Sequence, residues 1–469
     1  MVNIPLDMKR ALILSLAGAA GLVASCSFGP IWSTPEMPVP AEFRGAGLTG
    51  STMADLPWQQ VLKDANLEKL LNDVFASNRS LVAMMHNVDS ARRYITVARA
   101  PMFPWVGYLG QASKGAASTA SISTANETKI PGAGGLSASW ELDLWGKTRK
   151  GVESAEAQAL EAEENMNYMR ISLMKQVACG YLQLIMLDEQ LKIAHSAVES
   201  YRESLNLFEN QLENGVADRL QTASAQAALS AAEAQIPNLQ MQITELENTL
   251  SVLAGRMPGP IARSGSMLAF ANASKVAAGI PADVIARRPD IRAAEQNLRA
   301  ANAEVGVAIA NYFPSISLTG LAGIATPDLR HGLSRSVDGW GIGANLTGPL
   351  FQAGQLRANE AMKRDSFLAA KANYEETVLS AMAEISTTLV QRNKLRQIMK
   401  KQEQAVAAYQ ESVKLSKARY AQGLASYYEV LTAQQGLFPA QTQLAAYRFQ
   451  YAACVPTLYT QLGGGWQNK

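Results

Sequence analysis

Residues 355–422 read QLRANEAMKRDSFLAAKANYEETVLSAMAEISTTLVQRNKLRQIMKKQEQAVAAYQESVKLSKARYAQ, and this stretch decides the fold. Its 68 positions contain neither glycine nor proline, the residues least favourable in a helix. A continuous helix of that length would span about 100 Å, far more than a globular domain needs. Its apolar residues follow the steps of three and four that coiled coils use. They include Val378, Met382, Ile385 and Leu389, and later Val406, Tyr409 and Val413.

The long helical stretch occurs twice, because the chain contains an internal repeat. Residues 147–214 contain no proline and only two glycines. This stretch stops before Gly215, just as the later one stops before Gly423, and these two glycines are 208 residues apart. Gly146 and Gly354, which precede the two stretches, are also 208 residues apart. The fold is therefore built from two copies of one unit.

A glycine marks the tip of a helical hairpin in each copy. Glycine just after a helix readily adopts the left-handed conformation that ends it. A second helical stretch follows Gly215 and runs to about Leu253, and another follows Gly423 and runs to about Leu462. We therefore expect two hairpins, each with its turn at one of these glycines.

Each copy opens with a shorter helix and continues into two strands. We expect the helices at about residues 67–100 and 289–312, and the strands within about 103–145 and 313–352. The strand segments alternate apolar and polar side chains with period two, which predicts strands with two different faces. The apolar positions are Leu136, Ala138, Trp140, Leu142 and Leu144 in copy one, and Trp340, Ile342, Ala344 and Leu346 in copy two.

Segments of this kind are also typical of transmembrane barrel strands. Four strands cannot close such a barrel, which needs about eight or more. Strands must therefore be pooled, and three chains would supply twelve. Trp105, Tyr108 and Trp140 are candidates for an aromatic belt at the lipid–water boundary, with Trp105 favoured. Trp145 is instead expected to pack where the strands meet the helices.

The N-terminus has the features of an export signal. A basic pair precedes an apolar run at residues 11–23, which is too short to span a bilayer stably. The segment ends in Ala24-Ser25-Cys26, which resembles the signal of bacterial lipoproteins. That resemblance implies cleavage before Cys26 and lipidation of this residue, and Ser27 in place of Asp favours sorting to the outer membrane. The alternative is an ordinary secretory signal with an incidental cysteine.

Composition argues against an enzyme and against a nucleic-acid binder. The chain has 42 Lys and Arg against 40 Asp and Glu, and its net charge of +2 provides no basic surface. The three cysteines lie far apart and the three histidines are not at ligand spacing. We find no glycine-rich phosphate loop and no nucleophile–base motif. We therefore expect no catalytic residues, no cofactor and no metal site.

The start of the second copy carries a longer motif. Residues 280–295 read IPADVIARRPDIRAAE, and residues 310–314 read ANYFP. Together with Val177-Ala178, Tyr181-Leu182 and residues 423–434, they resemble the TolC family of outer-membrane efflux channels. The closest likeness is to its OprM-like lipoprotein branch, which works with resistance-nodulation-division pumps. The resemblance covers nearly all of the chain after Cys26.

This resemblance implies an α+β membrane protein. It implies a homotrimer whose 12-stranded β-barrel, with four strands per chain, lies in the outer membrane and continues into a long periplasmic α-helical barrel. The barrel would conduct drugs or other small molecules passively to the exterior. Its partners would be outer-membrane lipid, a periplasmic membrane-fusion adaptor and an inner-membrane resistance-nodulation-division transporter, with no nucleic acid.

Two alternatives to small-molecule efflux stay open. Within the family, the channel could serve protein secretion or metal-cation efflux. Outside it, a periplasmic coiled-coil lipoprotein or adaptor would explain Cys26 and the long helices, but not four alternating strands placed alike in both copies.

The expected organisation has six parts. They are a signal peptide at residues 1–25, a lipid-anchored equatorial segment at 26–66, repeat 1 at 67–255 with its hairpin at 147–253, an equatorial linker at 256–280, repeat 2 at 281–462 with its hairpin at 355–462, and a tail at 463–469.

The hairpin tips are the candidate gate, because the resemblance implies closure of the periplasmic end there. Glu429, six positions after Gly423, is expected to line the constriction. Asp218, Arg219 and Tyr420 are expected to hold the closed state through contacts between helices. Relatives often carry a second acidic residue nine positions after the glycine, where this chain has Thr432. The alternative is that all of these are solvated tip residues.

Overall fold

The computed structural model describes residues 28–38, 40, 42–44, 52–112, 131–215, 218–273, 281–327, 329, 332–334 and 336–466. The chain forms two compact units. Unit 1 contains the described residues within Met1–Glu36, Val88–Ala162 and Ala293–Tyr374. Unit 2 contains those within Met37–Asn87, Glu163–Arg292 and Glu375–Lys469. Each unit is therefore assembled from both copies of the repeat.

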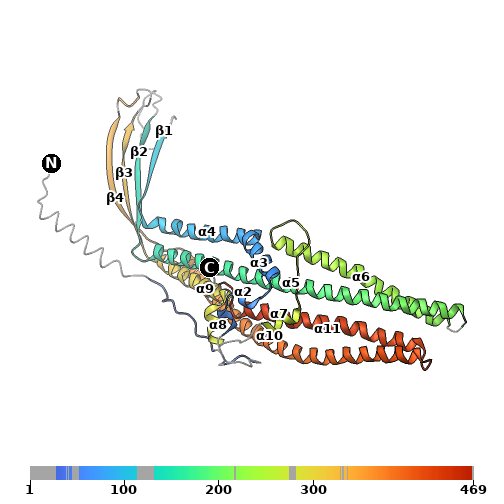
Figure 1. Cartoon of the computed structure of the whole chain (residues 1–469). Helices are drawn as coiled ribbons and strands as arrows, with labels where there is room; N and C mark the ends of the chain where they lie inside the picture. Colours follow the sequence, from blue (N-terminus) through green and yellow to red (C-terminus); the bar gives the residue numbers. More distant parts are fainter. Residues whose placement is uncertain are drawn as a thin grey trace. The chain divides into compact units, whose positions relative to one another are not determined.

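The described elements are helices and four strands (Figure 1). The strands are β1 (Trp105–Ala112), β2 (Gly132–Leu142), β3 (Ser315–Thr326) and β4 (Val337–Thr347). The helices are α2 (Trp58–Val61), α3 (Ala65–Ser77), α4 (Arg79–Arg99), α5 (Lys147–Glu213), α6 (Arg219–Leu253), α7 (Met267–Ala273), α8 (Pro281–Arg287), α9 (Pro289–Ala310), α10 (Gln355–Ala421) and α11 (Tyr427–Gln461), with 3-10 turns at Met53–Asp55 and Ala100–Met102. Among these described helices, none is both long and apolar enough to cross a membrane.

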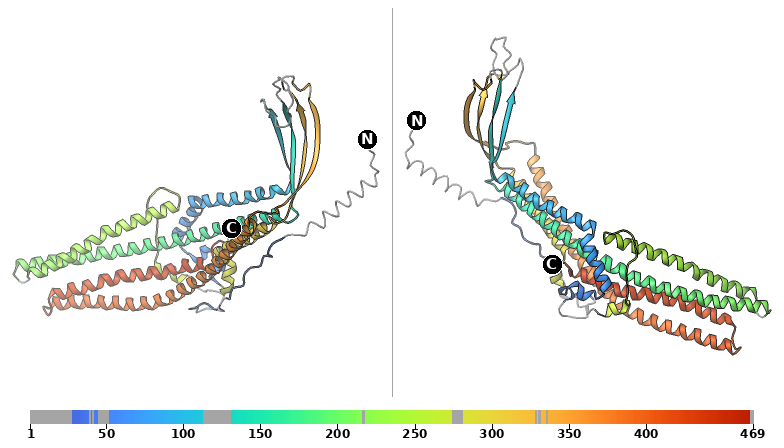
Figure 2. Two further views of the ribbon diagram at one scale, coloured as in Figure 1. Left: turned by 180° about the vertical axis from the view of Figure 1, so that it is seen from behind. Right: turned by 45° about the horizontal axis from the view of Figure 1, so that its top comes forward.

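The repeat is exact in the lengths of the hairpin helices. Helices α5 and α10 both have 67 residues, and α6 and α11 both have 35. In unit 2, α5 runs beside α6 in a first hairpin and α10 runs beside α11 in a second (Figure 2). Each helix of the second hairpin begins 208 residues after its counterpart, since 355 − 147 and 427 − 219 both equal 208. The two predicted hairpins are confirmed.

The helix predicted at residues 67–100 is in fact two helices, α3 and α4, separated at Asn78. Asn78 leaves the helical conformation, with φ −62° and ψ 120°. Its side-chain oxygen accepts a hydrogen bond from the Leu81 amide at 2.9 Å, and its amide group donates to the Leu253 carbonyl at 2.8 Å. Asparagine caps a helix start in this way, because its side chain replaces a missing backbone partner.

The four strands form one antiparallel sheet in unit 1, in the order β1-β2-β3-β4. Directly paired residues of neighbouring strands project from the same face. One face, which we call the apolar face, carries these rows across the sheet: Tyr108–Leu136–Ala322–Trp340, Val106–Ala138–Gly320–Ile342, Trp140–Leu318–Ala344 and Leu142–Ile316–Leu346. The predicted alternation is therefore confirmed in the register.

The opposite face, which we call the small-polar face, is mostly serine, threonine, asparagine and glycine. Its rows include Trp105–Ser139–Thr319–Gly343, Gly107–Ser137–Leu321–Gly341 and Glu141–Ser317–Asn345. Trp105 lies on this face, against our expectation that it leads a belt on the apolar side. Positions three apart in a strand point to opposite faces, so Tyr108 is apolar-facing and Trp105 is not. The Trp105 ring lies over Gly107, where a Cβ would meet it at 2.3 Å.

In unit 1 an aromatic cluster of Phe28, Trp145 and Phe313 lies where the strands meet the helices. The Trp145 ring stacks on Phe313 with ring centroids 5.0 Å apart, and Phe313 stacks on Phe28 at 4.6 Å. The Trp145 indole donates a hydrogen bond to the Pro314 carbonyl at 2.6 Å. The expected packing of Trp145 at this junction is confirmed, and the Phe-Pro pair of copy two has a physical role.

In unit 2 the motif at residues 280–295 forms a buried ion pair between Arg288 and Asp290. Arg288 is only 7% exposed and holds Asp290 with two hydrogen bonds, of 3.0 and 2.6 Å. It also donates to Glu384 of α10 at 3.2 Å and to the Gln461 carbonyl of α11 at 3.3 Å. The motif thus joins the start of α9 to both helices of the second hairpin.

Candidate functional site

The two tip glycines have the conformation that the sequence predicts. Gly215 has φ +71° and Gly423 has φ +70°, the left-handed region that glycine enters without strain. Their amides donate to the carbonyls of Leu212 at 3.0 Å and Tyr420 at 2.9 Å. A Cβ on either glycine would meet nothing within 4 Å, so their backbone conformation, and not a lack of space, favours glycine.

Asp218 and Arg219 stand just after the first tip. The Asp218 carboxylate accepts a hydrogen bond from the Gln221 amide at 3.0 Å and caps the start of α6. Ser426 caps α11 in the same way, and it occupies the equivalent position 208 residues later. Arg219 is exposed, and within the part of the chain that the structure describes it has no ion-pair partner. In the single chain Asp218 therefore stabilises the start of its own helix, and its expected contact between helices stays a prediction.

Tyr420 links the two hairpins. Its hydroxyl accepts a hydrogen bond of 2.7 Å from the Gln211 side chain on α5. Its ring meets the Tyr427 ring edge to face, with centroids 4.9 Å apart, and Tyr427 in turn meets Phe208 of α5 at 5.5 Å. Aromatic pairs in this geometry contribute about 0.5–1.5 kcal/mol beyond the apolar area that they bury. The first hairpin thus holds the second at this point through both a polar and an apolar contact.

A buried polar group lies deeper in the same interface and was missed by the sequence analysis. Ser204 of α5 is fully buried, and its hydroxyl lies 3.2 Å from both the Tyr427 hydroxyl and the Gln434 side-chain oxygen of α11. It donates to the Ser200 carbonyl at 2.9 Å. Beyond it, burial raises the pKa of Tyr201 to about 12, and the ring of that tyrosine packs against Phe438. The sequence alone does not show that Ser204 contacts Tyr427 and Gln434, because Ser204 belongs to the first half of the internal repeat and the other two belong to the second half.

Glu429 lies at the surface of the second tip. Its carboxylate is 3.7 Å from Arg419 of the same hairpin, and both side chains are more than half exposed. Arg419 also donates to the Leu424 carbonyl at 3.4 Å. Thr432, one turn further along, donates to the Tyr428 carbonyl of its own helix at 2.9 Å. The structure therefore does not bring Glu429 together with Asp218 or Tyr420, and it leaves the Glu429 carboxylate in contact with solvent.

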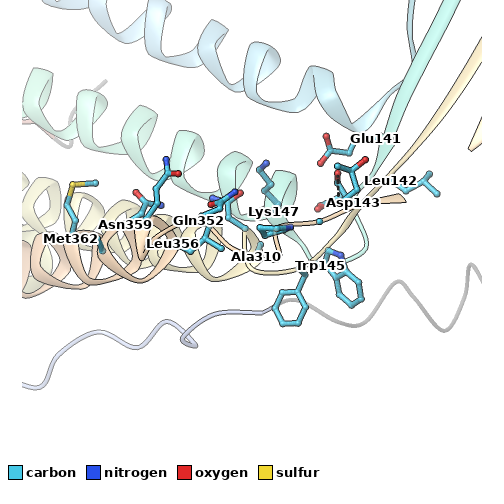
Figure 3. A pocket seen from close by; sticks show the side chains of 18 residues that line it. Glu141, Leu142, Asp143, Trp145, Lys147, Ala310, Gln352, Leu356, Asn359 and Met362 are labelled. Carbon is cyan, nitrogen blue, oxygen red and sulfur yellow. Dashed lines mark hydrogen bonds between the residues drawn. The ribbon is translucent and has the colours of Figure 1, made fainter. Parts of the chain in front are cut away.

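A cavity of about 840 Å³ lies in unit 1, where the strands meet the helices (Figure 3). Its lining includes the acidic side chain of Asp143, the basic side chain of Lys147 and the neutral amide of Asn359. The Asp143 carboxylate accepts hydrogen bonds from the amides of Thr148 and Arg149 at 3.1 and 2.9 Å, so it stabilises the start of α5. No group of three or more potential metal ligands occurs among the described residues. The cavity is thus walled by both polar side chains and apolar ones such as Phe313 and Leu356.

The candidate lipid-attachment residue Cys26 lies outside the described residues. The chain is first described at Phe28, two residues later. The Phe28 amide donates to the Trp145 carbonyl at 3.4 Å, and its ring belongs to the aromatic cluster of unit 1. Phe28 therefore lies beside the segment that joins β2 to α5.

Three comparisons agree on the kind of protein that this chain resembles. The family model described as Outer membrane efflux protein matches residues 70–256 and 280–464. The toluene efflux pump outer membrane protein TtgC of Pseudomonas putida is 33% identical over 468 residues, which cover 97% of this chain and 96% of TtgC. The cation efflux system protein CusC of Escherichia coli is 28% identical over 450 residues, which cover 95% of this chain and 97% of CusC. A solved structure of the outer-membrane channel OprN matches with a TM-score of 0.84 at 27% identity, covering 94% of this chain and all of OprN.

Proposed function

Because this chain belongs to the outer membrane efflux protein family, we propose that three copies of it form one continuous duct for the export of small molecules. Like its relatives, the chain is the outer-membrane channel component of an efflux system. Members of the family are channels, and the duct proposed here conducts passively, with no catalytic step of its own.

The apolar face of the sheet is the observation that carries this proposal. Trp340 and Ile342 are each 81% exposed and Tyr108 is 89% exposed. A soluble protein rarely leaves so large an apolar surface in water, whereas lipid would cover it favourably. The small-polar face suits a water-filled lumen, because its serine, threonine and asparagine side chains can form hydrogen bonds with water.

The edges of the sheet require more than one copy. In lipid every backbone N–H and C=O must be paired, so an open edge strand is not stable there. Strands β1 and β4 are both edge strands in the single chain. Pairing β4 of one copy with β1 of the next in a ring of three would close twelve strands, above the minimum of about eight.

The partners and substrates of the duct follow from its place in an efflux system. We propose that the second hairpins and first hairpins together line a periplasmic extension, joined through an adaptor to an inner-membrane transporter that supplies energy. TtgC takes part in toluene efflux and CusC in cation efflux. Of these substrates we favour small apolar molecules such as toluene, because TtgC is the more similar of the two relatives, at 33% identity against 28% for CusC.

A deletion strain tests the proposal. Loss of the gene should sensitise cells to solvents and antibiotics, and the restored gene should reverse the effect. Sensitivity limited to copper or silver salts would replace this substrate class with cations. Unchanged sensitivity to every compound, in a strain without a second channel of this family, would contradict efflux as the function.

We propose that Tyr420 holds the tips closed, and Tyr420→Phe tests this role. The substitution keeps the ring and removes the hydrogen bond with Gln211, which contributes about 1 kcal/mol, or about fivefold in an equilibrium constant per subunit. Single-channel recordings should show a larger open fraction. Tyr428→Phe is the matched control, because Tyr428 is half exposed at the same tip and its ring faces solvent. Equal open fractions in wild type and Tyr420→Phe would contradict the role.

The tip carboxylates are proposed to set ion selectivity. Glu429→Gln should reduce the preference for cations, because it removes one negative charge per subunit from the constriction. Asp218→Asn is the informative partner variant, since asparagine still caps α6 while the charge is lost. Reversal-potential measurements in a salt gradient report the change. Unaltered selectivity in both variants would show that these are only solvated surface charges.

We also propose that a lipid on Cys26 anchors the chain in the membrane. The lipobox-like residues support this, as does the position of Phe28 beside the strand ends. Cys26→Ala should abolish incorporation of radiolabelled palmitate while leaving the thermal stability of the folded chain unchanged. Cys454→Ala is the control and should still incorporate the label, because Cys454 is buried. A wild-type protein without label would refute the anchor.

A further inference from the structure

The cavity of unit 1 opens on the small-polar face of the sheet. Ser315 of β3 pairs with Thr347 of β4 at the end of the sheet nearest the helices, and both residues line the cavity. They lie two positions from Ser317 and Asn345, which project from the small-polar face, so they project from that face too. Glu141 belongs to the row of Ser317 and Asn345 and also lines the cavity. In the duct proposed above this face lines the lumen, so a molecule moving along the duct would meet the cavity.

Two opposite charges line this cavity without a partner. Glu141 lies at the end of β2, and Lys147 is the first residue of α5 (Figure 3). Both residues are exposed, and within the described part of the chain their charged groups form no hydrogen bond or ion pair with each other or with another residue. Asp143, the third charged residue of the lining, is instead held by Arg149 at 3.2 Å and by two backbone amides of α5. The groups left to meet a ligand are therefore one carboxylate and one ammonium.

An apolar wall completes the cavity. It includes the rings of Trp145 and Phe313 and the side chain of Leu356 on α10. The Trp145 ring is held in place by its stacking on Phe313 and by its hydrogen bond to the Pro314 carbonyl. A wall that is already ordered saves the entropy that binding would otherwise cost. The volume of about 840 Å³ lies within the range of about 300–1,000 Å³ that small-molecule sites occupy.

We propose that this cavity binds small aromatic zwitterions. The ligand's ammonium group lies at Glu141, its carboxylate lies at Lys147, and its ring lies against the apolar wall. Glu141 and Lys147 are too far apart to pair with each other, so a ligand charged at both ends can bridge them. A ligand with a single charge leaves one of the two groups to water.

The location of this site in the lumen rests on the duct proposed above. The inference adds a second class of transported molecule to the apolar molecules already proposed. Weak binding is expected here, because a molecule that is conducted must also leave its site.

Three matched ligands test the class of molecule. The zwitterion 4-(aminomethyl)benzoate carries both charges, 4-methylbenzoate lacks the ammonium group, and benzylamine lacks the carboxylate. Isothermal titration calorimetry of the purified full chain at pH 7 should show the zwitterion binding about fivefold more tightly than either of the others, the effect of one exposed ion pair. Equal affinities for the three ligands would overturn the proposal.

Substitutions assign the two charges. Glu141→Gln should lower the affinity for the zwitterion to that for 4-methylbenzoate, and Lys147→Gln should lower it to that for benzylamine. The exchange Glu141→Lys/Lys147→Glu should restore the preference for the zwitterion, which then binds in the opposite orientation. Glu156→Gln is the matched control, because Glu156 also lies on α5 but pairs with Arg99 outside the cavity lining. An undiminished preference for the zwitterion in Glu141→Gln, or its loss in Glu156→Gln, would overturn the site.

Currents in planar bilayers separate this site from the duct itself. In wild type, 4-(aminomethyl)benzoate should reduce the current more than it does in Glu141→Gln, because the occupied site narrows the lumen. A protein that conducts but binds the three ligands equally would overturn the site and leave the duct intact. A protein that prefers the zwitterion through Glu141 but carries no current would support the ligand class and overturn the duct.

Discussion

Arginine at position 342 should prevent assembly of the channel in the outer membrane. Ile342 is the central residue of β4, lies on the apolar face and is 81% exposed. An arginine on the lipid face of a barrel costs about 2–4 kcal/mol near the midplane of the bilayer, and each assembled particle would carry three. For Ile342→Arg we expect little or no three-copy protein in outer-membrane fractions, measured by immunoblot of unheated samples.

The adjacent position supplies a matched control. Gly341 is on the small-polar face, its φ is not in the left-handed region, and a Cβ there would meet nothing within 4 Å. Gly341→Arg adds the same charge at the same point of the strand but directs it to the lumen. We expect this variant to assemble and to change ion selectivity. Equal assembly of Ile342→Arg and Gly341→Arg would contradict the assignment of the two faces.

Arg288→Ala should destabilise unit 2 by about 3 kcal/mol, because removal of one partner from a buried ion pair leaves the other uncompensated. Arg288 is 7% exposed and Asp290 19%, so solvent can replace little of the lost interaction. The Gln461 carbonyl and Glu384 each lose a donor as well. The midpoint of thermal unfolding, followed by circular dichroism of the helices, should fall by several degrees.

The neighbouring Arg287 provides a control, because it also forms an ion pair but is less buried than Arg288. Arg287 pairs with Asp55, but their side chains are 28% and 48% exposed. Exposed pairs contribute at most about 1 kcal/mol, so Arg287→Ala should shift the midpoint only slightly. If the two alanine variants unfolded at the same temperature, the buried network of Arg288 would not be the fastening that the structure suggests.

The sequence predicted those features that depend on local patterns. Gly215 and Gly423 could be assigned because a helix end needs a left-handed residue, and the strands because apolar and polar residues alternate. The break at Asn78 was also within reach, since asparagine before Arg79 and Ser80 is a common helix cap. The alternation of side chains along a strand would also have placed Trp105 and Tyr108 on opposite faces, because they are three residues apart.

The contacts between hairpins were beyond the sequence. Ser204 meets Gln434 across 230 residues, and Gln211 meets Tyr420 across 209, so no periodicity in one helix relates them. Tyr420 was chosen from its place near the tip, but its partner was unknown. The capping role of Asp218 was missed, although a carboxylate three residues before a free backbone amide is a common helix cap.

Ion conductance of the purified chain in planar lipid bilayers tests the central claim most directly. The account predicts that the protein has a mass of three copies in detergent and gives discrete current steps in the bilayer. It also predicts that Tyr420→Phe spends more time open than wild type or Tyr428→Phe. A stable three-copy particle that inserts into the bilayer but carries no current, even with Tyr420→Phe, would contradict the view that this chain forms a duct gated at its hairpin tips.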